Sequence, residues 1–257
     1  MIFDTHCHLD FDAFDQDREV VLARAAAVGV ARFMLPGVSV NNWQKVRDLS
    51  AQHERCYYAL GLHPYFLNQH QEQDLILLEQ ELIKNSSDMH AVGEIGLDGH
   101  LKHLDEKRQY YFFYQQLKLA KQYNKPVILH VRHRHEKIVN AVKELDFVSG
   151  GVIHAFSGSV EVAKNYVDLG LKLGLGSVLT YTNSRKLRAV VKSLPLSSFV
   201  LETDAPDMPM RGQFDRRNEP CFITQVLDAL CCERKESREK IAEALWKNSL
   251  SLFGMEN

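Results

Sequence analysis

Ile2-Phe3-Asp4-Thr5-His6-Cys7-His8-Leu9-Asp10 opens the chain and decides between two folds. The apolar run Ile2–His6 is typical of a buried parallel strand, which reads as a continuous hydrophobic segment. Such strands build either a closed barrel or an open doubly wound sheet, and the open sheet usually has a glycine-rich phosphate loop after its first strand. Here that place is taken by His6-Cys7-His8. The stretch therefore favours the barrel.

The rest of the chain repeats this strand signal and alternates it with amphipathic segments. Seven further apolar runs are strand candidates: Arg32–Leu35, Tyr57–Leu62, Ala91–Ile95, Val127–His130, Gly151–His154, Leu171–Gly174 and Phe199–Glu202. The helix candidates are Asp17–Val28, Asp74–Lys84, Asp105–Tyr123, Glu136–Leu145, Val160–Leu169, Ser184–Lys192, Cys221–Cys232 and Ser237–Phe253. This alternation predicts an α/β fold, a TIM-like (β/α)8 barrel, in a single domain spanning 1–257.

The composition bounds the classes of function. The formal net charge of −2 argues against a surface that grips nucleic acid along its length. Five cysteines, an odd number without a CxxC pair, are typical of reduced thiols in a cytoplasmic protein. The chain does not begin with a basic segment followed by an apolar run, and its most apolar stretch, Ala25–Val38, is interrupted by charged, proline and glycine residues. We expect neither a signal peptide nor a membrane span.

The histidines of the opening stretch are candidate metal ligands. Side chains alternate along a strand, so His6 and His8 are expected to point the same way and Cys7 the opposite way. Two imidazoles on one face at a strand end suit a metal ion. Taken alone, the motif fits a pair of polar histidines on a loop equally well.

Further candidates stand at the carboxyl ends of other predicted strands, which converge on one face of a barrel, where active sites form. They are His63, Glu94, His130, His154 and Asp204. The histidines that fall in helical or connecting segments are expected to be solvated surface residues: His53, His70, His90 and His103.

The donor types indicate the metal chemistry. Six residues form the predicted ligand set: His6, His8, Glu94, His130, His154 and Asp204. Four imidazoles and two carboxylates suit divalent metals such as zinc, manganese, nickel or iron. Six ligands exceed what one tetrahedral site needs, so two metals sharing a carboxylate bridge is the economical interpretation.

These motifs, taken in order, resemble the signature series of the TatD family. The series runs Asp4-Thr5-His6-Cys7-His8-Leu9-Asp10, Gly61-Leu62-His63-Pro64, Gly93-Glu94-Ile95-Gly96-Leu97-Asp98, His130, His154-Ala155-Phe156-Ser157-Gly158, Glu202-Thr203-Asp204-Ala205-Pro206 and Arg217-Asn218-Glu219-Pro220. The family comprises metal-dependent hydrolases of the amidohydrolase superfamily, several of them deoxyribonucleases. The chain is most similar to the YjjV-type bacterial branch.

The resemblance implies a role for each ligand. It assigns one metal to His6, His8, Glu94 and Asp204, and the second to Glu94, His130 and His154. Glu94 would bridge the two divalent cations, for which zinc, magnesium and manganese are the candidates, and Asp204 would be the general base. This agrees with the physical expectation that a metal lowers the pKa of bound water from about 16 to near 7 while a carboxylate takes the proton.

Substrate contacts are expected around this centre. His63 is either a proton donor or substrate contact in the pocket, or a histidine that supports a ligand from behind. Arg132 follows its strand by two residues and suits a phosphate, although a salt bridge at the rim would also explain it. Glu202 is expected to orient a ligand. Arg211 and Arg217 belong to a basic loop that is either a solvated face or a phosphate contact.

The sequence departs from the family pattern at four places. Gly99-His100 stand where relatives commonly carry aromatic residues, and Val131-Arg132-His133 replace a frequent Ser-Arg-Asp. Ala155 replaces a frequent cysteine, and the loop 211–218 is longer than the common form. All four lie at the expected substrate mouth, so they bear on substrate identity and leave the ligand set intact.

Three functions follow from these observations. The leading one is hydrolysis of phosphate esters, including single-stranded DNA ends, by a hydroxide bound at the two-metal centre, with no obligate protein partner. The alternative is hydrolysis of a small amide, lactone or phosphate ester at the same centre, because fold does not settle function. A non-enzymatic, zinc-stabilised interaction protein fits poorly, because structural zinc sites are closed and rich in thiolates.

Overall fold

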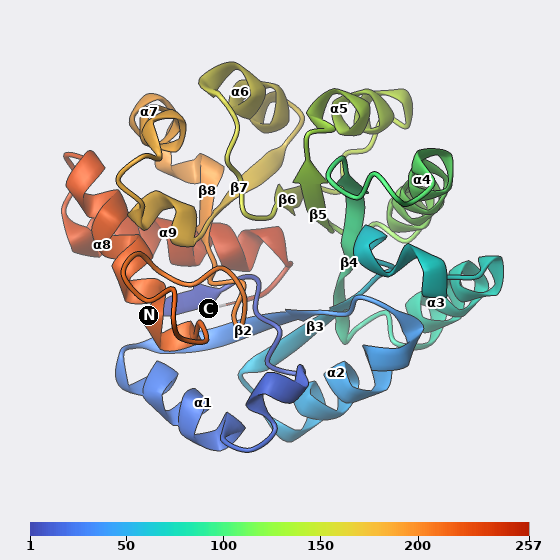
Figure 1. The fold of residues 1–257 in the computed structure, drawn as a ribbon, viewed down its shortest axis with the longest axis horizontal. Helices are drawn as coiled ribbons and strands as arrows, with labels where there is room; N and C mark the ends of the chain where they lie inside the picture. The colour runs from blue at the N-terminus through green and yellow to red at the C-terminus, as the bar shows by residue number, and fades with distance from the viewer. Residues whose placement is uncertain (257) are drawn as a thin grey trace.

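The parallel barrel expected from the strand signals is present. The computed structural model describes residues 1–256, so the predicted domain boundary at Asn257 lies outside them. Within these residues one eight-stranded parallel sheet runs in sequence order (Figure 1). Its strands are β1 (Ile2–Asp4), β2 (Val30–Pro36), β3 (Cys56–Leu60), β4 (Met89–Asp98), β5 (Val127–Arg132), β6 (Gly151–Ile153), β7 (Leu171–Leu175) and β8 (Phe199–Leu201).

The last strand returns to the first. The backbone amide and the hydroxyl of Thr5 both donate hydrogen bonds to the carbonyl of Leu201, at 2.9 and 2.8 Å. These bonds place the end of β8 beside the end of β1 and nearly close the barrel. The predicted (β/α)8 architecture is therefore confirmed.

Helices form the outer ring (Figure 1). They are α1 (Arg18–Ala27), α2 (Val40–Gln52), α3 (Glu72–Lys84), α4 (Glu106–Gln122), α5 (His135–Glu144), α6 (Val160–Asp168), α7 (Arg185–Ser193), α8 (Ile223–Glu233) and α9 (Arg238–Leu252). All helices predicted from the sequence are present, with ends displaced by no more than two residues. Asp105 caps α4, as its position suggests, because its carboxylate accepts hydrogen bonds from the amides of Lys107 and Arg108.

Helix α2 was not predicted from the sequence. Its buried side chains Trp43, Val46 and Leu49 recur every three residues, without the additional apolar residues at a spacing of four that usually widen the buried face of a helix. In a mostly polar segment this pattern is too sparse to indicate a helix. The start signal was available, because Ser39 and Asn42 form a capping box in which the Asn42 side chain accepts from the Ser39 amide at 3.1 Å.

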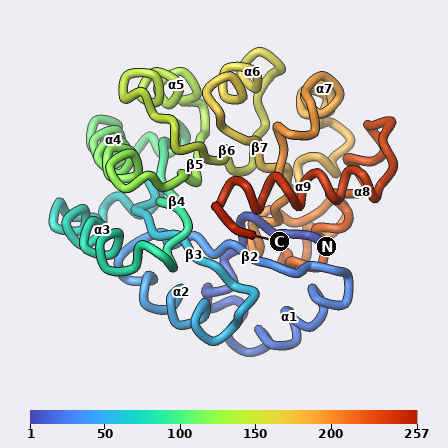
Figure 2. Tube along the Cα trace, turned by 180° about the vertical axis from the view of Figure 1, so that it is seen from behind, coloured from blue at the N-terminus to red at the C-terminus, as the bar shows by residue number. Residues whose placement is uncertain are grey.

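The interior of the barrel is packed from its amino-terminal end. Seven strands each send one buried side chain inward: Phe3, Met34, Ala59, Ala91, Ile128, Val152 and Val200. Helix α9 crosses this end of the barrel (Figure 2), and its Trp246 ring packs on Phe3 with centroids 6.3 Å apart. Because α9 fills the amino-terminal end, the opposite end, where the strands terminate, is left for the polar residues.

Candidate metal centre

His6 and His8 lie just beyond β1, not within it. Their Nε2 atoms are 3.2 Å apart, so the rings converge as expected, and Cys7 is fully buried in the hydrophobic core. The strand itself ends at Asp4, whose buried carboxylate accepts from the amide and hydroxyl of Thr203 at 2.9 and 2.6 Å. Because the two histidines lie beyond the strand, the alternation of side chains along a strand does not set the direction of their imidazoles. Hydrogen bonds between the end of β1 and the segment after β8 set it.

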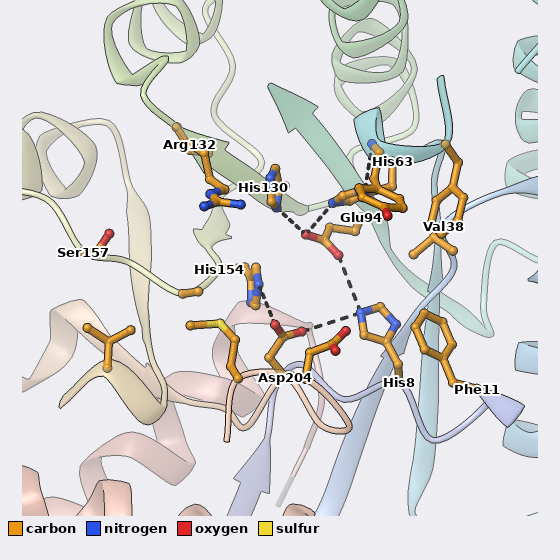
Figure 3. Close-up of a pocket in the computed structure, with 17 residues that line it drawn as sticks. His8, Phe11, Val38, His63, Glu94, His130, Arg132, His154, Ser157 and Asp204 are labelled. Atoms are coloured by element: carbon orange, nitrogen blue, oxygen red, sulfur yellow. Dashed lines mark hydrogen bonds and ion pairs between the residues drawn. The ribbon is translucent and has the colours of Figure 1, made fainter. Parts of the chain in front are cut away.

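Glu94, in the second half of β4, occupies the middle of the cluster (Figure 3). Its Oε2 lies 3.2 Å from the Nε2 of His6 and 3.7 Å from that of His8. Its Oε1 lies 3.2 Å from both the Nε2 of His63 and the Nδ1 of His130. Burial acts to raise the pKa of Glu94, but the surrounding histidines, His63 foremost, hold that pKa well below its usual range. The carboxylate is therefore ionised and faces imidazoles on both sides.

Asp204 follows β8 and faces the same space (Figure 3). Its Oδ1 is 3.5 Å from His6 Nε2 and 3.7 Å from His8 Nε2, and its Oδ2 is 3.6 Å from His154 Nε2. Burial raises the pKa of Asp204 to about 6, against the opposing effect of the nearby histidines. The backbone holds this residue at a φ of 60°, in the left-handed region that aspartate and asparagine tolerate better than most residues.

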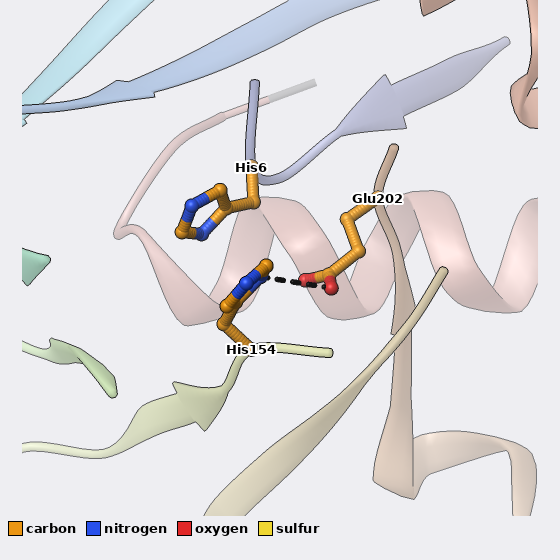
Figure 4. A group of neighbouring side chains, drawn as sticks. All are labelled: His6, His154 and Glu202. Carbon is orange, nitrogen blue, oxygen red and sulfur yellow. Dashed lines mark ion pairs between the residues drawn. The ribbon is translucent and has the colours of Figure 1, made fainter. Parts of the chain in front are cut away.

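Two histidines each contact a carboxylate through the ring nitrogen that faces away from the cluster. His130 contacts Asp98 through Nε2 at 3.0 Å, and His154 contacts Glu202 through Nδ1 at 3.0 Å (Figure 4). Each pairing directs the other ring nitrogen into the cluster, as in carboxylate–histidine–metal arrangements. Against the effect of burial, Glu202 and Asp204 raise the pKa of His154 to about 10. The contact with His154 supports the expectation that Glu202 orients a ligand. The corresponding contact of Asp98 with His130 was not expected from the sequence, where Asp98 appears only within a motif.

The backbone of the neighbouring segments leaves room for the Glu202 carboxylate. Its carboxylate accepts from the amide of Ala155 at 2.6 Å and is fully buried. A Cβ at Gly174 would lie only 2.2 Å from Oε2 of Glu202, so a side chain at this position of β7 would displace the carboxylate. Gly174 is thus a functional position that no motif in the sequence marked.

Glu202→Gln should weaken metal binding without unfolding the protein. The amide keeps the shape but cannot offer a carboxylate to the Nδ1 proton of His154, and loss of such a partner typically costs about 10- to 100-fold in metal affinity or activity. Metal content after graded chelation, with thermal melting in parallel, measures the effect. Glu243→Gln on the exposed face of α9 is the matched control. Equal metal retention in both variants would show that Glu202 does not position His154.

His63 presents a proton to the cluster. Its Nδ1 accepts a hydrogen bond from the amide of Tyr65 at 3.1 Å. A neutral imidazole with an accepting Nδ1 carries its proton on Nε2, which here points at Glu94 Oε1 at 3.2 Å. Nε2 therefore has no free lone pair for a metal, and the geometry fits a donor better than a ligand.

The expectation that the remaining histidines are solvated surface residues was wrong for His70, and His90 is half-buried, with its ring packed on Tyr57 at a centroid distance of 5.1 Å. His70 is 2% exposed and not a solvated surface residue. Its Nε2 lies 2.9 Å from the carbonyl oxygen of His63, and its ring packs on Phe112 of α4 with centroids 5.6 Å apart. His70 is buried because it secures the loop that carries His63, a tertiary contact that local sequence does not reveal.

The donor set fits divalent cations. Three groups of potential ligand atoms lie within 4.8 Å of one another: His6, His8 and Asp204; His6, His154 and Glu202; and His63, Glu94 and His130. Burial and the neighbouring His6 lower the pKa of His8 well below its usual value, so its ring is neutral and its nitrogen free to coordinate. Imidazole and carboxylate donors without thiolates suit zinc, manganese, nickel or iron.

A cavity of about 580 Å³ opens above the cluster. Arg132, whose side chain is 55% exposed, lines it, and Asp98 Oδ2 lies 3.7 Å from its guanidinium. Arg217 lies elsewhere: its guanidinium donates to both oxygens of Asp17, at 2.9 and 2.7 Å. Arg211 is exposed and does not line the cavity. Of the three arginines expected to contact substrate, the structure brings only Arg132 to the cluster within the part of the chain it describes.

A (β/α)8 barrel with imidazoles and carboxylates gathered at the carboxyl ends of its strands is typical of metal-dependent hydrolases. The family described as TatD related DNase matches residues 3–254, and the chain belongs to this family. The resemblance in the sequence motifs is thereby confirmed.

Individual relatives agree with this assignment. The chain is 42% identical over 252 residues to "Uncharacterized metal-dependent hydrolase YjjV" of Escherichia coli, covering 98% of this chain and 97% of the relative. The crystal structure of that E. coli TatD homologue superposes with a TM-score of 0.96 over 99% of this chain and 98% of the other. A "3'-5' ssDNA/RNA exonuclease TatD" of Pantoea ananatis is 32% identical, covering 99% of this chain and 100% of the relative. The protein is thus a metal-dependent hydrolase. Among residues 1–256, no helix is long and apolar enough to cross a membrane.

Proposed function

We propose that this protein is a two-metal phosphodiesterase that removes nucleotides from the ends of single-stranded nucleic acid. The observation that carries the proposal is the position of Glu94, whose two carboxylate oxygens face separate sets of imidazoles on the floor of an open cavity. The name of the Pantoea relative, a 3'-5' ssDNA/RNA exonuclease, suggests the substrate class and the direction of digestion.

The proposed ligands divide between the two oxygens of Glu94. His6, His8 and Asp204 share the side of Oε2, and His130 lies on the side of Oε1. His154, the other proposed ligand of the second metal, stacks on His6 with ring centroids 3.7 Å apart and lies 3.6 Å from Asp204 Oδ2. When the histidines are neutral, four carboxylates remain in or behind the cluster: Glu94, Asp98, Glu202 and Asp204. Two divalent cations would balance these four negative charges, as buried charges require. When bound, the metals supply Lewis acidity and lower the pKa of water.

We assign proton transfer and phosphate binding to three side chains that line the cavity. Asp204 is the proposed acceptor of the proton from the attacking water, because its carboxylate faces the cavity and the ligand histidines. His63, with its proton on Nε2, is the proposed donor to the leaving oxygen. Arg132 on the cavity wall is the proposed contact for a substrate phosphate.

The experiment that tests the proposal is digestion of end-labelled single-stranded DNA with added zinc, manganese or magnesium. We expect metal-dependent shortening from one end, absent in Asp204→Asn. We also expect slower shortening of a duplex, because a protein with a net charge of −2 offers little electrostatic attraction along a double strand. A protein that holds two metals yet leaves DNA and RNA intact would contradict the proposal. The search would then turn to small phosphate esters, lactones and amides.

Arg132→Ala should raise KM for DNA about tenfold and change kcat little. A charge-assisted hydrogen bond to phosphate is lost, while the metal ligands are untouched. Steady-state kinetics on the labelled oligonucleotide measures the split. Arg211→Ala is the matched control, since that exposed arginine lies outside the cavity wall and should leave both constants unchanged. An unchanged KM in Arg132→Ala would remove this residue from substrate binding.

A further inference from the structure

One wall of the cavity is aromatic. Phe11 comes from the loop after β1, and Tyr65 and Phe66 come from the short helix Pro64–Gln69 after β3. The Phe11 ring stacks on His8 with centroids 4.5 Å apart and planes 20° apart. Phe66 packs against His63 with centroids 6.2 Å apart. These rings therefore stand directly beside the proposed ligands and the proposed proton donor.

Tyr65 stands out within this wall because it is 64% exposed. Its ring meets Phe66 nearly edge to face, with centroids 5.2 Å apart and planes 76° apart. Aromatic side chains usually bury most of their surface, so an exposed ring at the rim of a catalytic cavity indicates a surface for a flat apolar partner. The backbone amide of Tyr65 also donates to His63 Nδ1, which fixes the backbone at Tyr65 relative to His63.

The opposite wall carries a cationic and a hydroxyl side chain. Arg132 and Ser157 lie across the cavity from Phe11 and Val38, with the carboxylates between them (Figure 3). The ligand that matches this order has a flat aromatic group on one side, an anionic phosphate on the other and the ester between them. A nucleotide has this arrangement, whereas a simple alkyl phosphate lacks the flat group.

We infer that Tyr65, supported by Phe66, stacks the terminal nucleobase of the substrate and makes the site selective for ends that carry a base. This inference rests on the proposed function and names a specificity-determining residue for it. Stacking on an aromatic ring tolerates every base, because each base has a π-face. The site therefore selects for the presence of a base and is nearly indifferent to its identity.

The test compares two oligonucleotides that differ only in the terminal residue of the digested end. One carries a normal base, and the other carries a tetrahydrofuran abasic analogue. The wild-type enzyme should cleave the base-bearing end with a KM about tenfold lower, in keeping with the contribution of one stacked base. Tyr65→Ala should bring the two KM values together at nearly unchanged kcat, and Tyr65→Phe should keep the difference.

Tyr111→Ala is the matched control, because Tyr111 is an exposed tyrosine on α4 that does not line the cavity. It should behave as the wild type, and thermal melting verifies that each variant is folded. Equal KM values for both ends in the wild type, or a preference that survives in Tyr65→Ala, would overturn the inference while leaving the nuclease activity established. Failure to cleave either oligonucleotide would overturn both the inference and the proposed function.

Discussion

Glu94→Gln should abolish hydrolysis and empty both metal positions. The two oxygens of Glu94 face different histidine sets, and a neutral amide cannot supply an anionic oxygen to each side. Loss of the bridge removes the charge that offsets two buried cations, so we expect turnover to fall by about 10³-fold or more. Metal analysis after dialysis should show both equivalents weakened together, because one residue serves both.

The matched control for this variant is again Glu243→Gln, which makes the same chemical change on an exposed helix face. Far-UV circular dichroism should show that both variants fold, since the substitution keeps the shape of the side chain. Retention of two tightly bound metals in Glu94→Gln would contradict the bridging role. Loss of a single equivalent would place Glu94 on one metal only.

Asp204→Asn should lose most of the rate while keeping the fold. An amide cannot accept a proton from water, and removal of a positioned general base typically costs about 10²- to 10⁴-fold. Asparagine is the right replacement because it tolerates the left-handed backbone at this position, where φ is 60°. Alanine would add backbone strain and confuse the comparison.

Single-turnover kinetics with saturating metal separates the two roles of Asp204. If the residue only binds metal, excess metal should restore the rate of Asp204→Asn. If it is also the base, the rate stays low at every metal concentration, and a turnover near that of the wild type would remove Asp204 from this role.

Structural context explains why some parts of the site escaped prediction. The candidate ligands could be picked out because each stands in or just after an apolar strand segment, and the carboxyl ends of parallel strands meet on one face of a barrel. Asp98 and Gly174 were missed because their roles depend on contacts across neighbouring strands, with His130 and Glu202 respectively. Neither contact leaves a signal in local spacing.

The arginines show the same limit. Arg132 ends β5 and Arg217 lies in the loop between β8 and α8, and the sequence offers no way to rank them. In the structure Arg132 lines the cavity, whereas Arg217 is held by Asp17, from the start of α1, and by Glu219. The carboxylates that the fold places beside each arginine decide which arginine is free to face the substrate.

By itself, the sequence determined the barrel, the candidate metal-ligating residues and their common face, because hydrophobic periodicity and strand-end placement are local properties that the chain carries along its length. Only the tertiary structure decided which nitrogen of each histidine faces the cluster, since Asp98, Glu202 and the Tyr65 amide reach those rings from other strands or from a folded loop. It also decided that Tyr65 stands exposed beside the cluster. Orientation depends on partners distant in sequence, and the folded chain alone brings them together.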